Sequence, residues 1–366
     1  RVAYTYDDGD HRQTGQTTYL YANGEPTTVF PVNTPLITSQ GYELNKRDRQ
    51  SYAILHQVSG EYRGNFGDLT AVLGVRAPFF RRNLNQFCYT TSAGGFLDCI
   101  PESGQAAYEA ANPYTFDPAT GDVTGSAPPQ QRIYEYDEIL PNVGFVYDLG
   151  AASVFANYAK GLSVPGTDVL YDSLYFPVTA ASARPAPETT DTVDAGFRFT
   201  TNKIQGQIAG YFTRYENRLA SSYDPLLDET ITRNLGQVDK YGVDASLAYQ
   251  PTRDLLLYVF GSYNESEIKS DTQFVCSDED ADDGRFGCAT EGDIVLAPTG
   301  GKSESGAPLW SIGGRAQYNL GPVEFGAQVK HTGKRYVNDT NEARTDGYTL
   351  VDLDVRWVIA ENPFGD

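Results

Sequence analysis

The sequence has 366 residues and a formal net charge of −20, from 28 Lys and Arg against 48 Asp and Glu. This acidic balance argues against nucleic-acid binding, because neutralising phosphates needs clustered basic side chains. The 36 Gly, 26 Tyr and 18 Phe, with no Met, favour strands and turns over helices. The absence of any run of about 18 apolar residues excludes a transmembrane helix, but a membrane-barrel strand needs only about 9–11 alternating residues.

Apolar and polar residues alternate along most of the chain, in about a dozen segments that approach the length of a membrane-crossing strand. The clearest segments span residues 52–58, 69–75, 143–149, 193–199, 241–249, 310–318, 323–329 and 349–357. In a strand, this alternation puts the apolar residues on one face and the polar residues on the other. We therefore predict an all-β chain.

The segment YGVDASLAY (241–249) shows the character of the two faces. Its apolar face begins and ends in a tyrosine, and aromatic rings with a polar tip prefer the membrane–water interface. We predict a lipid-interface girdle from Tyr241, Tyr249, Trp310, Tyr318 and Trp357. On the other face we predict a lumen-facing set of Arg198, Lys240, Asp244, Arg315, Asp352 and Arg356.

Short and long connections between these segments alternate along the chain. Residues 148–150, 200–203, 249–254 and 318–322 form short connections, whereas residues 81–131, 162–187, 218–230 and 270–307 form long polar ones. An up-and-down barrel with one short-turn end and one long-loop end produces this rhythm. A large soluble β-sandwich is the alternative that alternation alone leaves open.

Six stretches carry a family resemblance through their order and spacing. They are PNVGFVYDL (141–149), FANYAKGLSVP (155–165), PETTDTVDAGFRF (187–199), NLGQVDKYGVDASLAYQP (234–251), HTGKRYVNDTN (331–341) and DGYTLVDLDVRW (346–357). Together they resemble the C-terminal barrel half of a TonB-dependent outer-membrane receptor, over most of residues 130–357. APFFRRNLNQFCYT (77–90) is similar to a subgroup of these receptors with cysteines in an outer loop.

The resemblance implies part of a 22-stranded antiparallel transmembrane β-barrel in the bacterial outer membrane, with short periplasmic turns and long extracellular loops. It further implies energy-coupled import of a scarce nutrient, foremost a ferric siderophore or other iron chelate, bound at the extracellular loops. The TonB–ExbB–ExbD complex would act on an N-terminal segment that is not in this sequence. Because neither a plug domain nor the family's last strands are recognisable, we expect residues 1–366 to be a partial barrel domain.

Two other functions fit parts of the pattern. A passive porin would share the barrel but not the energy coupling. A secreted all-β binding protein or adhesin would share the strands but not the membrane. No cofactor is implied, and no combination of residues indicates an enzyme, since GxSxG, HExxH and P-loop motifs are absent.

The four cysteines fall into two close pairs without a histidine nearby, which argues against a zinc site. We predict the disulfides Cys88–Cys99 and Cys276–Cys288 in preference to free thiols, although four cysteines allow three connectivities.

Two kinds of loop residue are weaker candidates for ligand contact. The acidic loop carries Asp278, Glu279, Asp280, Asp282 and Asp283, whose oxygens could bind Ca²⁺, but the spacing of an EF-hand is missing and a solvated loop tip is favoured. Tyr171, Tyr175, Phe176 and Tyr223 could stack on a bound ligand, with ordinary loop packing as the alternative.

Overall fold

The computed structural model describes residues 1–16, 36–37, 41, 43–118, 121–224, 229–276, 278–290 and 294–357. These residues form two compact units. Unit 1 comprises Arg1–Gly60, Arg76–Ile139 and Ser163–Pro187, and unit 2 comprises Glu61–Val75, Leu140–Leu162 and Glu188–Asp366. None of the helices in the described residues is long and apolar enough to cross a membrane.

Unit 1 is built on long antiparallel strands. Its elements are β1 (Val2–Gln16), β2 (Leu36–Ile37), the first part of β3 (Glu43–Phe66), the second part of β4 (Leu69–Gln86), β5 (Tyr89–Thr90), β6 (Leu97–Asp98), α1 (Glu102–Ala111), β7 (Thr115–Phe116), β8 (Val123–Thr124), β9 (Gln130–Asp137), α2 (Thr167–Asp172), and the 3-10 turns η1 (Ser173–Tyr175) and η2 (Ala181–Ala183). Strand β1 pairs with β3, and β9 pairs with β4.

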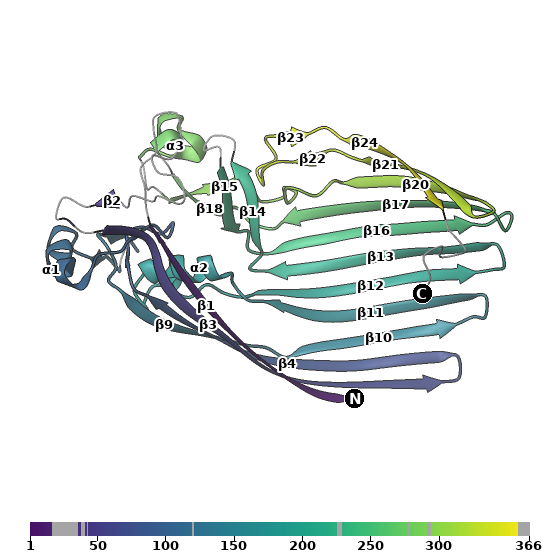
Figure 1. The fold of residues 1–366 in the computed structure, drawn as a ribbon, viewed down its shortest axis with the longest axis horizontal. Coiled ribbons are helices and arrows are strands. Elements are labelled where there is room, and N and C mark those ends of the chain that lie inside the picture. Colours follow the sequence, from purple (N-terminus) through teal and green to yellow (C-terminus); the bar gives the residue numbers. More distant parts are fainter. Residues whose placement is uncertain are drawn as a thin grey trace, which may run out of the picture. The chain divides into compact units, whose positions relative to one another are not determined.

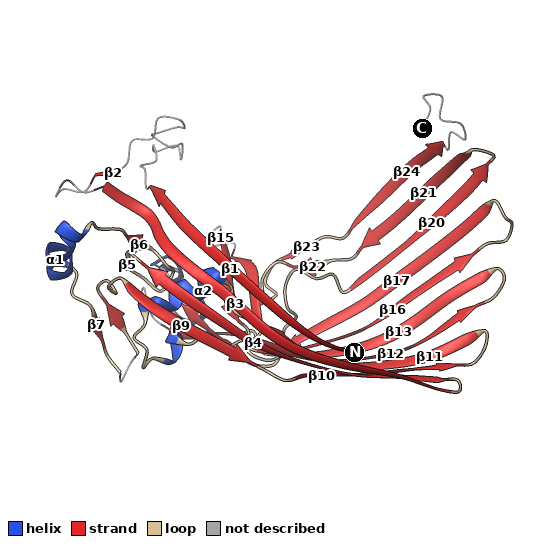
Figure 2. Ribbon diagram, turned by 60° about the horizontal axis from the view of Figure 1, so that its bottom comes forward, coloured by secondary structure: helices blue, strands red, loops and turns tan. Residues whose placement is uncertain are grey.

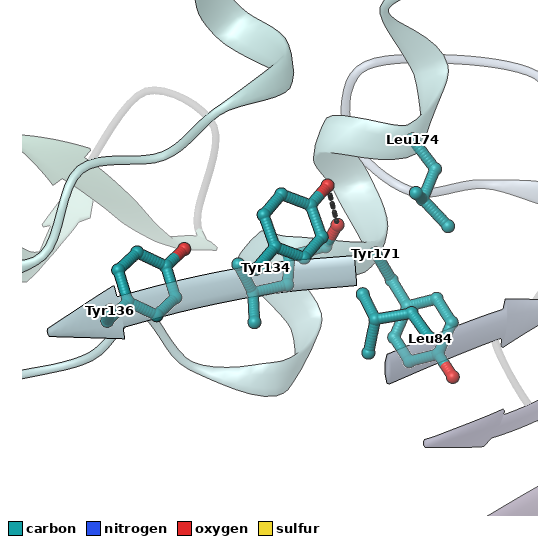
Figure 3. Packing of buried hydrophobic residues seen from close by; sticks show 6 residues of the cluster. Leu84, Tyr134, Tyr136, Tyr171 and Leu174 are labelled. Atoms are coloured by element: carbon teal, nitrogen blue, oxygen red, sulfur yellow. Dashed lines mark hydrogen bonds between the residues drawn. The ribbon is translucent and has the colours of Figure 1, made fainter. Parts of the chain in front are cut away.

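The core of unit 1 lies where α2 and η1 pack on strands β4 and β9 (Figure 3). Leu84, Leu170 and Leu174 are fully buried there. The hydroxyl of Tyr134 donates to the backbone oxygen of Leu170 at 3.4 Å and lies 2.6 Å from Ser173 Oγ, so the buried ring keeps a polar partner.

Unit 2 is a sheet of consecutive antiparallel strands (Figure 1). In spatial order, β4 is followed by β10 (Leu140–Asp148), β11 (Ala152–Ser163), β12 (Glu188–Thr200), β13 (Ile204–Glu216), β16 (Val238–Tyr249), β17 (Leu255–Ile268), β20 (Trp310–Leu320), β21 (Val323–Thr332) and β24 (Tyr348–Trp357). The connections contain β14 (Leu219–Asp224) paired with β15 (Glu229–Asn234), β18 (Thr272–Val275) paired with β19 (Ile294–Ala297), β22 (Arg335–Tyr336) paired with β23 (Arg344–Thr345), the helix α3 (Asp278–Asp282) and the 3-10 turn η3 (Arg285–Gly287).

The strand register keeps the apolar residues of unit 2 on a single face. Leu247 lies opposite Val259 on β17, and farther along the sheet Val329 lies opposite Val351 on β24. We call this side the apolar face. Many of its large side chains are exposed, for example 39% of Leu247 and 79% of Leu353. A contiguous exposed surface of this kind requires an apolar surrounding, as the lipid-facing side of a membrane barrel does.

All five predicted girdle residues lie on the apolar face. Their exposed fractions are 38% for Tyr241, 40% for Tyr249, 43% for Trp310, 47% for Tyr318 and 68% for Trp357. They are therefore available to a surrounding membrane rather than packed inside the protein.

Aromatic rings lie directly across from glycines on neighbouring strands. The pairs are Phe199 with Gly206, Tyr211 with Gly242, and Phe260 with Gly313. A Cβ atom added to any of these glycines would come within 2.7 Å of the opposite side chain, so each side chain occupies the space that the glycine leaves. Glycine weakens a strand because it packs nothing, and the facing ring compensates for that loss.

The tight turns of unit 2 lie along one edge of its sheet, in both views (Figures 1 and 2). The predicted short connections 148–150, 200–203, 249–254 and 318–322 are confirmed between β10 and β11, β12 and β13, β16 and β17, and β20 and β21. Gly150 and Gly321 have φ of +84° and +59°, a conformation that glycine adopts without strain.

The long connections differ from the sequence prediction in one place. The region 81–131 was predicted as loop, but β4 continues to Gln86 and β9 begins at Gln130. The eight residues Phe79–Gln86 pair with β9 in register, so the six polar-rich residues after Phe80 continue the strand. Arg81 and Arg82 therefore belong to strand β4.

Lysine at Leu247 should impair membrane insertion more than lysine at the adjacent Ser246. Leu247→Lys places an ammonium on the apolar face, at a cost that falls from about 2–4 kcal/mol at the bilayer centre to about 0–1 kcal/mol at the interface. Ser246 lies on the opposite face beside a cavity of 340 Å³, lined also by Arg198 and Gln207, that leaves room for the longer side chain. The folded fraction in outer membranes, read from heat-modifiable gel migration, measures both variants. Equal yields would remove the assignment of the two faces.

Candidate functional site

The six predicted lumen-facing residues share the face of unit 2 opposite the apolar face. The register pairs Arg198 with Gln207, and Arg315 with Gln328, which in turn pairs with Asp352. We call this side the polar face. Its polar residues continue from β12 to β24, because each strand contributes every second residue to it.

An ion pair that spans the intervening strand β21 connects a charge of β20 with a charge of β24 on the polar face. Arg315 donates two hydrogen bonds to Asp354, at 2.7 and 2.8 Å. A Cβ atom on Gly326, which lies between them, would come within 2.3 Å of both side chains, so the glycine makes room for the pair. On β12, the Arg198 guanidinium lies 4.7 Å from the centre of the Phe155 ring.

Four charged residues form a network where the polar face reaches the long connections. Arg218 contacts Glu188 at 3.0 Å and Glu304 at 2.8 Å, and Lys240 contacts Glu304 at 2.9 Å. We call Glu188, Arg218, Lys240 and Glu304 the loop-end network. It joins the start of β12, the start of β16, the segment after β13 and the segment after β19.

The loop-end network is largely shielded from water. The Glu188, Lys240 and Glu304 side chains are 12%, 19% and 9% exposed. The ring of Tyr215 lies 4.7 Å from Arg218 and 5.0 Å from Lys240, and it also packs on a small buried cluster around Val238. Charge pairing in such surroundings holds a unique arrangement, because a lone buried ion would be costly.

The charges of the network act on the acidity of Glu304. Burial opposes ionisation of this carboxyl, but the hydrogen bonds and positive charges of Arg218 and Lys240 outweigh it, so the pKa of Glu304 lies below its ordinary value. The carboxylate therefore stays ionised at neutral pH.

The sequence analysis identified Lys240 but not the other three members of the loop-end network, Glu188, Arg218 and Glu304. Glu188 is 30 residues from Arg218, and Glu304 is 86 residues from it, so no spacing signals the contact. Asp354 is different, because it alternates with the predicted lumen-facing residues Asp352 and Arg356 within one strand.

The structure corrects the prediction of ligand contact for two loop tyrosines. Tyr171 and Tyr175 are 2% and 8% exposed. Tyr171 belongs to the core of unit 1, and the Tyr175 hydroxyl donates to the backbone oxygens of Val123 and Gly125. Phe176 is half-buried and meets Tyr175 edge-on. Tyr223 lies in β14, but its side chain is outside the described residues.

A buried basic residue organises helix α2 in unit 1. Arg49 forms an ion pair with Asp168, and its guanidinium lies 4.2 Å from the centre of the Tyr171 ring. The hydrogen bond from Arg49 lowers the pKa of Asp168, against the effect of burial. Asp172 behaves in the opposite way, because burial and the nearby Asp168 raise its pKa to about 6.

Both predicted disulfides, Cys88–Cys99 and Cys276–Cys288, are present. The second belongs to a small core with Phe274 and Ala297.

The acidic loop is only partly a solvated tip. Asp280 is fully buried and paired with Arg285 at 3.2 Å, which corrects the solvated reading for this residue. Asp282 and Asp283 are exposed, and the side chains of Asp278 and Glu279 lie outside the described residues. Within the described part of the chain, no three His, Cys, Asp or Glu side chains are grouped to hold a metal ion.

One exposed apolar face and one polar face on a sheet of consecutive antiparallel strands define the wall of a transmembrane β-barrel. The family model for the TonB dependent receptor-like β-barrel matches residues 2–362. The chain therefore belongs to this family, whose members are bacterial outer-membrane proteins.

Solved structures support the same fold. The ferric yersiniabactin uptake receptor FyuA from Yersinia pestis aligns with a TM-score of 0.55 and 14% identity, over 87% of this chain and 40% of that one. The ferric citrate transporter FecA aligns with a TM-score of 0.61 and 14% identity, over 98% and 44%. The ferric-catecholate import receptor Fiu from K12 E. coli aligns with a TM-score of 0.58 and 16% identity, over 99% and 45%.

The chain spans less than half the length of these structures. Comparison with curated proteins finds no match. At identities of 14–16%, the likeness to the solved structures concerns the fold.

Glu304→Gln should destabilise the long connections of unit 2. The variant leaves Lys240 and part of Arg218 without a carboxylate, at a cost of about 2–3 kcal/mol. The pKa of Glu304 is lower in the folded protein than in the unfolded chain. The ionised carboxylate therefore stabilises the folded protein fully above the ordinary carboxyl pKa of about 4.3. This contribution is lost as the pH falls through the pKa that Glu304 has in the folded protein. Protease resistance of the 298–309 connection between pH 7 and pH 3 measures the effect.

Glu267→Gln is the matched control for this experiment. It removes the same charge from a more exposed pair, in which Lys269 and Glu267 are 31% and 45% exposed, and should cost below about 1 kcal/mol. If both variants lose resistance equally, the loop-end network does not stabilise these connections.

Asp172→Asn should stabilise unit 1 at neutral pH. The raised pKa means that the folded protein holds the proton more tightly, so stability falls as pH rises from about 4 to about 6 and stays lower above. The variant should abolish this slope, as read from protease resistance of residues 163–187. Asp168→Asn should have the opposite effect at neutral pH, because it breaks the ion pair with Arg49. Identical pH profiles for Asp172→Asn and the wild type would be incompatible with this account.

Proposed function

We propose that the chain forms part of the barrel of an energy-coupled outer-membrane receptor that imports a ferric siderophore or another iron chelate. The polar face carries this proposal. A transport pathway needs a wall that tolerates water and a polar ligand, and the polar face provides such a wall.

The composition of the polar face suits contact with an inner plug domain. Arg198, Lys240, Asp244, Arg315, Asp352 and Arg356 are proposed as the lumen-facing charges. Both signs are present and some are already paired with each other, as Arg315 is with Asp354. Mixed charges can hold a polar domain through exchangeable ion pairs, whereas an apolar lining would fix it in place.

The loop-end network supports ligand capture at the opposite end from the tight turns. Its buried ion pairs hold the β14–β15 hairpin and the connection after β19 against the sheet, so these segments can present a defined surface. We propose that the ligand binds at this end and that the TonB–ExbB–ExbD complex supplies the energy from the periplasmic side.

The solved relatives guide the choice of substrate. The structures of FyuA, Fiu and FecA are described as receptors or transporters of ferric yersiniabactin, ferric catecholate and ferric citrate. A different metal also occurs, since OprC is described as a copper transporter. Iron chelates therefore come first in the test, with a copper salt as the alternative substrate.

Uptake of radioactive iron tests the proposal. Iron-starved cells with and without the gene are given ferric citrate, a ferric catecholate and a ferric hydroxamate in parallel. We expect at least about a tenfold loss of uptake for one chelate in the deletion strain, restored by the intact gene. Removal of TonB or of the proton-motive force should give the same loss.

The same experiment separates the receptor from a passive porin. A porin would still admit the chelate without TonB, and its flux would rise in proportion to concentration. Unchanged uptake of every iron chelate and of copper in the deletion strain would reject the proposed substrate class. The alternative of a secreted adhesin does not fit the family, because the members of this family are outer-membrane barrels.

A further inference from the structure

A groove of 580 Å³ lies at the loop side of β20 and β21, outside the polar face. Its floor is the Trp310 ring, which stacks on His331 at 4.9 Å between ring centres. Both residues have the parity of the apolar face, because Ile312 lies opposite His331 in the register. The groove therefore opens on the side of the sheet that faces lipid.

Glycine allows the groove to form. A Cβ atom on Gly333 would lie 2.9 Å from the backbone oxygen and 3.1 Å from the indole nitrogen of Trp310. The backbone nitrogen of Gly333 also donates to that oxygen at 2.9 Å. The indole thus lies against the chain where β21 ends, and the rim is left to the β22–β23 hairpin.

The rim of the groove is positively charged in a strongly acidic chain. Lys334, Arg335 and Arg344 line it together with a single carboxylate, Asp346, which Lys334 contacts at 3.6 Å. Arg335 and Arg344 are exposed, and the described part of the chain offers neither of them an ion pair. The chain as a whole has a net charge of −20, so this local excess of two positive charges is unusual.

We propose that this groove binds the phosphorylated headgroup of a lipid in the surrounding membrane leaflet. Arginine donates paired hydrogen bonds that match the oxygens of a phosphate, and basic pockets beside membrane-spanning segments bind anionic headgroups. The apolar face continues directly from the groove through Ile312, which lies opposite His331 and is 57% exposed. Acyl chains can lie along the apolar face while the phosphate meets the basic rim of the groove.

The charge and the position together favour a lipid over a soluble anion. A soluble anion would gain nothing from an indole floor and an adjoining exposed apolar surface. Tryptophan at this level of a barrel prefers the membrane interface, where headgroup phosphates lie. The inference uses only the outer-membrane location, so its test is independent of iron import.

Lipid retention by the intact protein, purified in detergent, tests the proposal. Native mass spectrometry measures binding of bis-phosphorylated lipid A and of the same lipid with its phosphates removed. We expect the wild type to bind the phosphorylated form at least about tenfold better, and Arg335→Gln/Arg344→Gln to lose this preference. Arg335→Lys/Arg344→Lys keeps both charges and should recover part of it.

A matched control removes the same charge elsewhere. Lys203→Gln/Arg253→Gln lies at the tight-turn edge of the sheet and should bind as the wild type does. Equal loss in both glutamine variants would reduce the effect to general surface charge and overturn the site. Inorganic phosphate, added alone as a competitor, should not displace the lipid at equal concentration. Full displacement would show an anion site without lipid selectivity, which also overturns the proposal.

Folding is checked on the same samples. Because Arg335 and Arg344 are exposed, heat-modifiable migration of the variants should match the wild type. If the glutamine variant misfolds, the single variants Arg335→Gln and Arg344→Gln are measured instead, each with an expected loss of about threefold.

Discussion

The pairing of backbone hydrogen-bonding groups along neighbouring strands is the constraint on which the rest of this structure depends. In an apolar membrane, an unpaired backbone group costs several kcal/mol, so each strand must lie against the next in register. Once the strands are paired, the alternation of apolar and polar residues determines which side chains lie on each face of the sheet. Val243 and Leu247 are directed to one side and Asp244 and Ser246 to the other, because a one-residue step reverses the direction of the side chain.

Ion pairs contribute differently to stability in the middle of the polar face and at its loop end. In the middle of the polar face, Arg315 and Asp354 are more exposed, and their pair is worth little as a source of stability. At the loop end, Glu304 and its partners are shielded, and losing one member leaves a buried charge without a partner. The same residue types therefore give adaptable contacts along the wall and a fixed arrangement at the loop end.

The sequence predicted the strands and their two faces well, because alternation is a local property that each strand carries by itself. Seven of the eight clearest segments lie wholly in strands, and 143–149 extends one residue beyond β10. Both disulfides follow from cysteines only 11 and 12 residues apart. Loops could not be predicted in the same way. Tyr171 is an aromatic residue in a long polar connection, which suggested a ligand contact, but it lies in a core. Asp280 belongs to an acidic run, which suggested a solvated loop tip, but it is buried beside Arg285. Both outcomes depend on contacts between distant segments, as does the meeting of Arg218 with Glu304.

The rings that face glycines across neighbouring strands have a consequence for assembly. Phe199 fits over Gly206, and Phe260 fits over Gly313, only when the two strands are aligned as they are here. If one strand slid by two residues, the faces would stay correct, but a ring would meet a Cβ atom and a glycine would face an empty site. Hydrophobic alternation cannot detect such an error, since it repeats every two residues. The ring-and-glycine pairs can, because each of them fits only one alignment of the two strands that it joins.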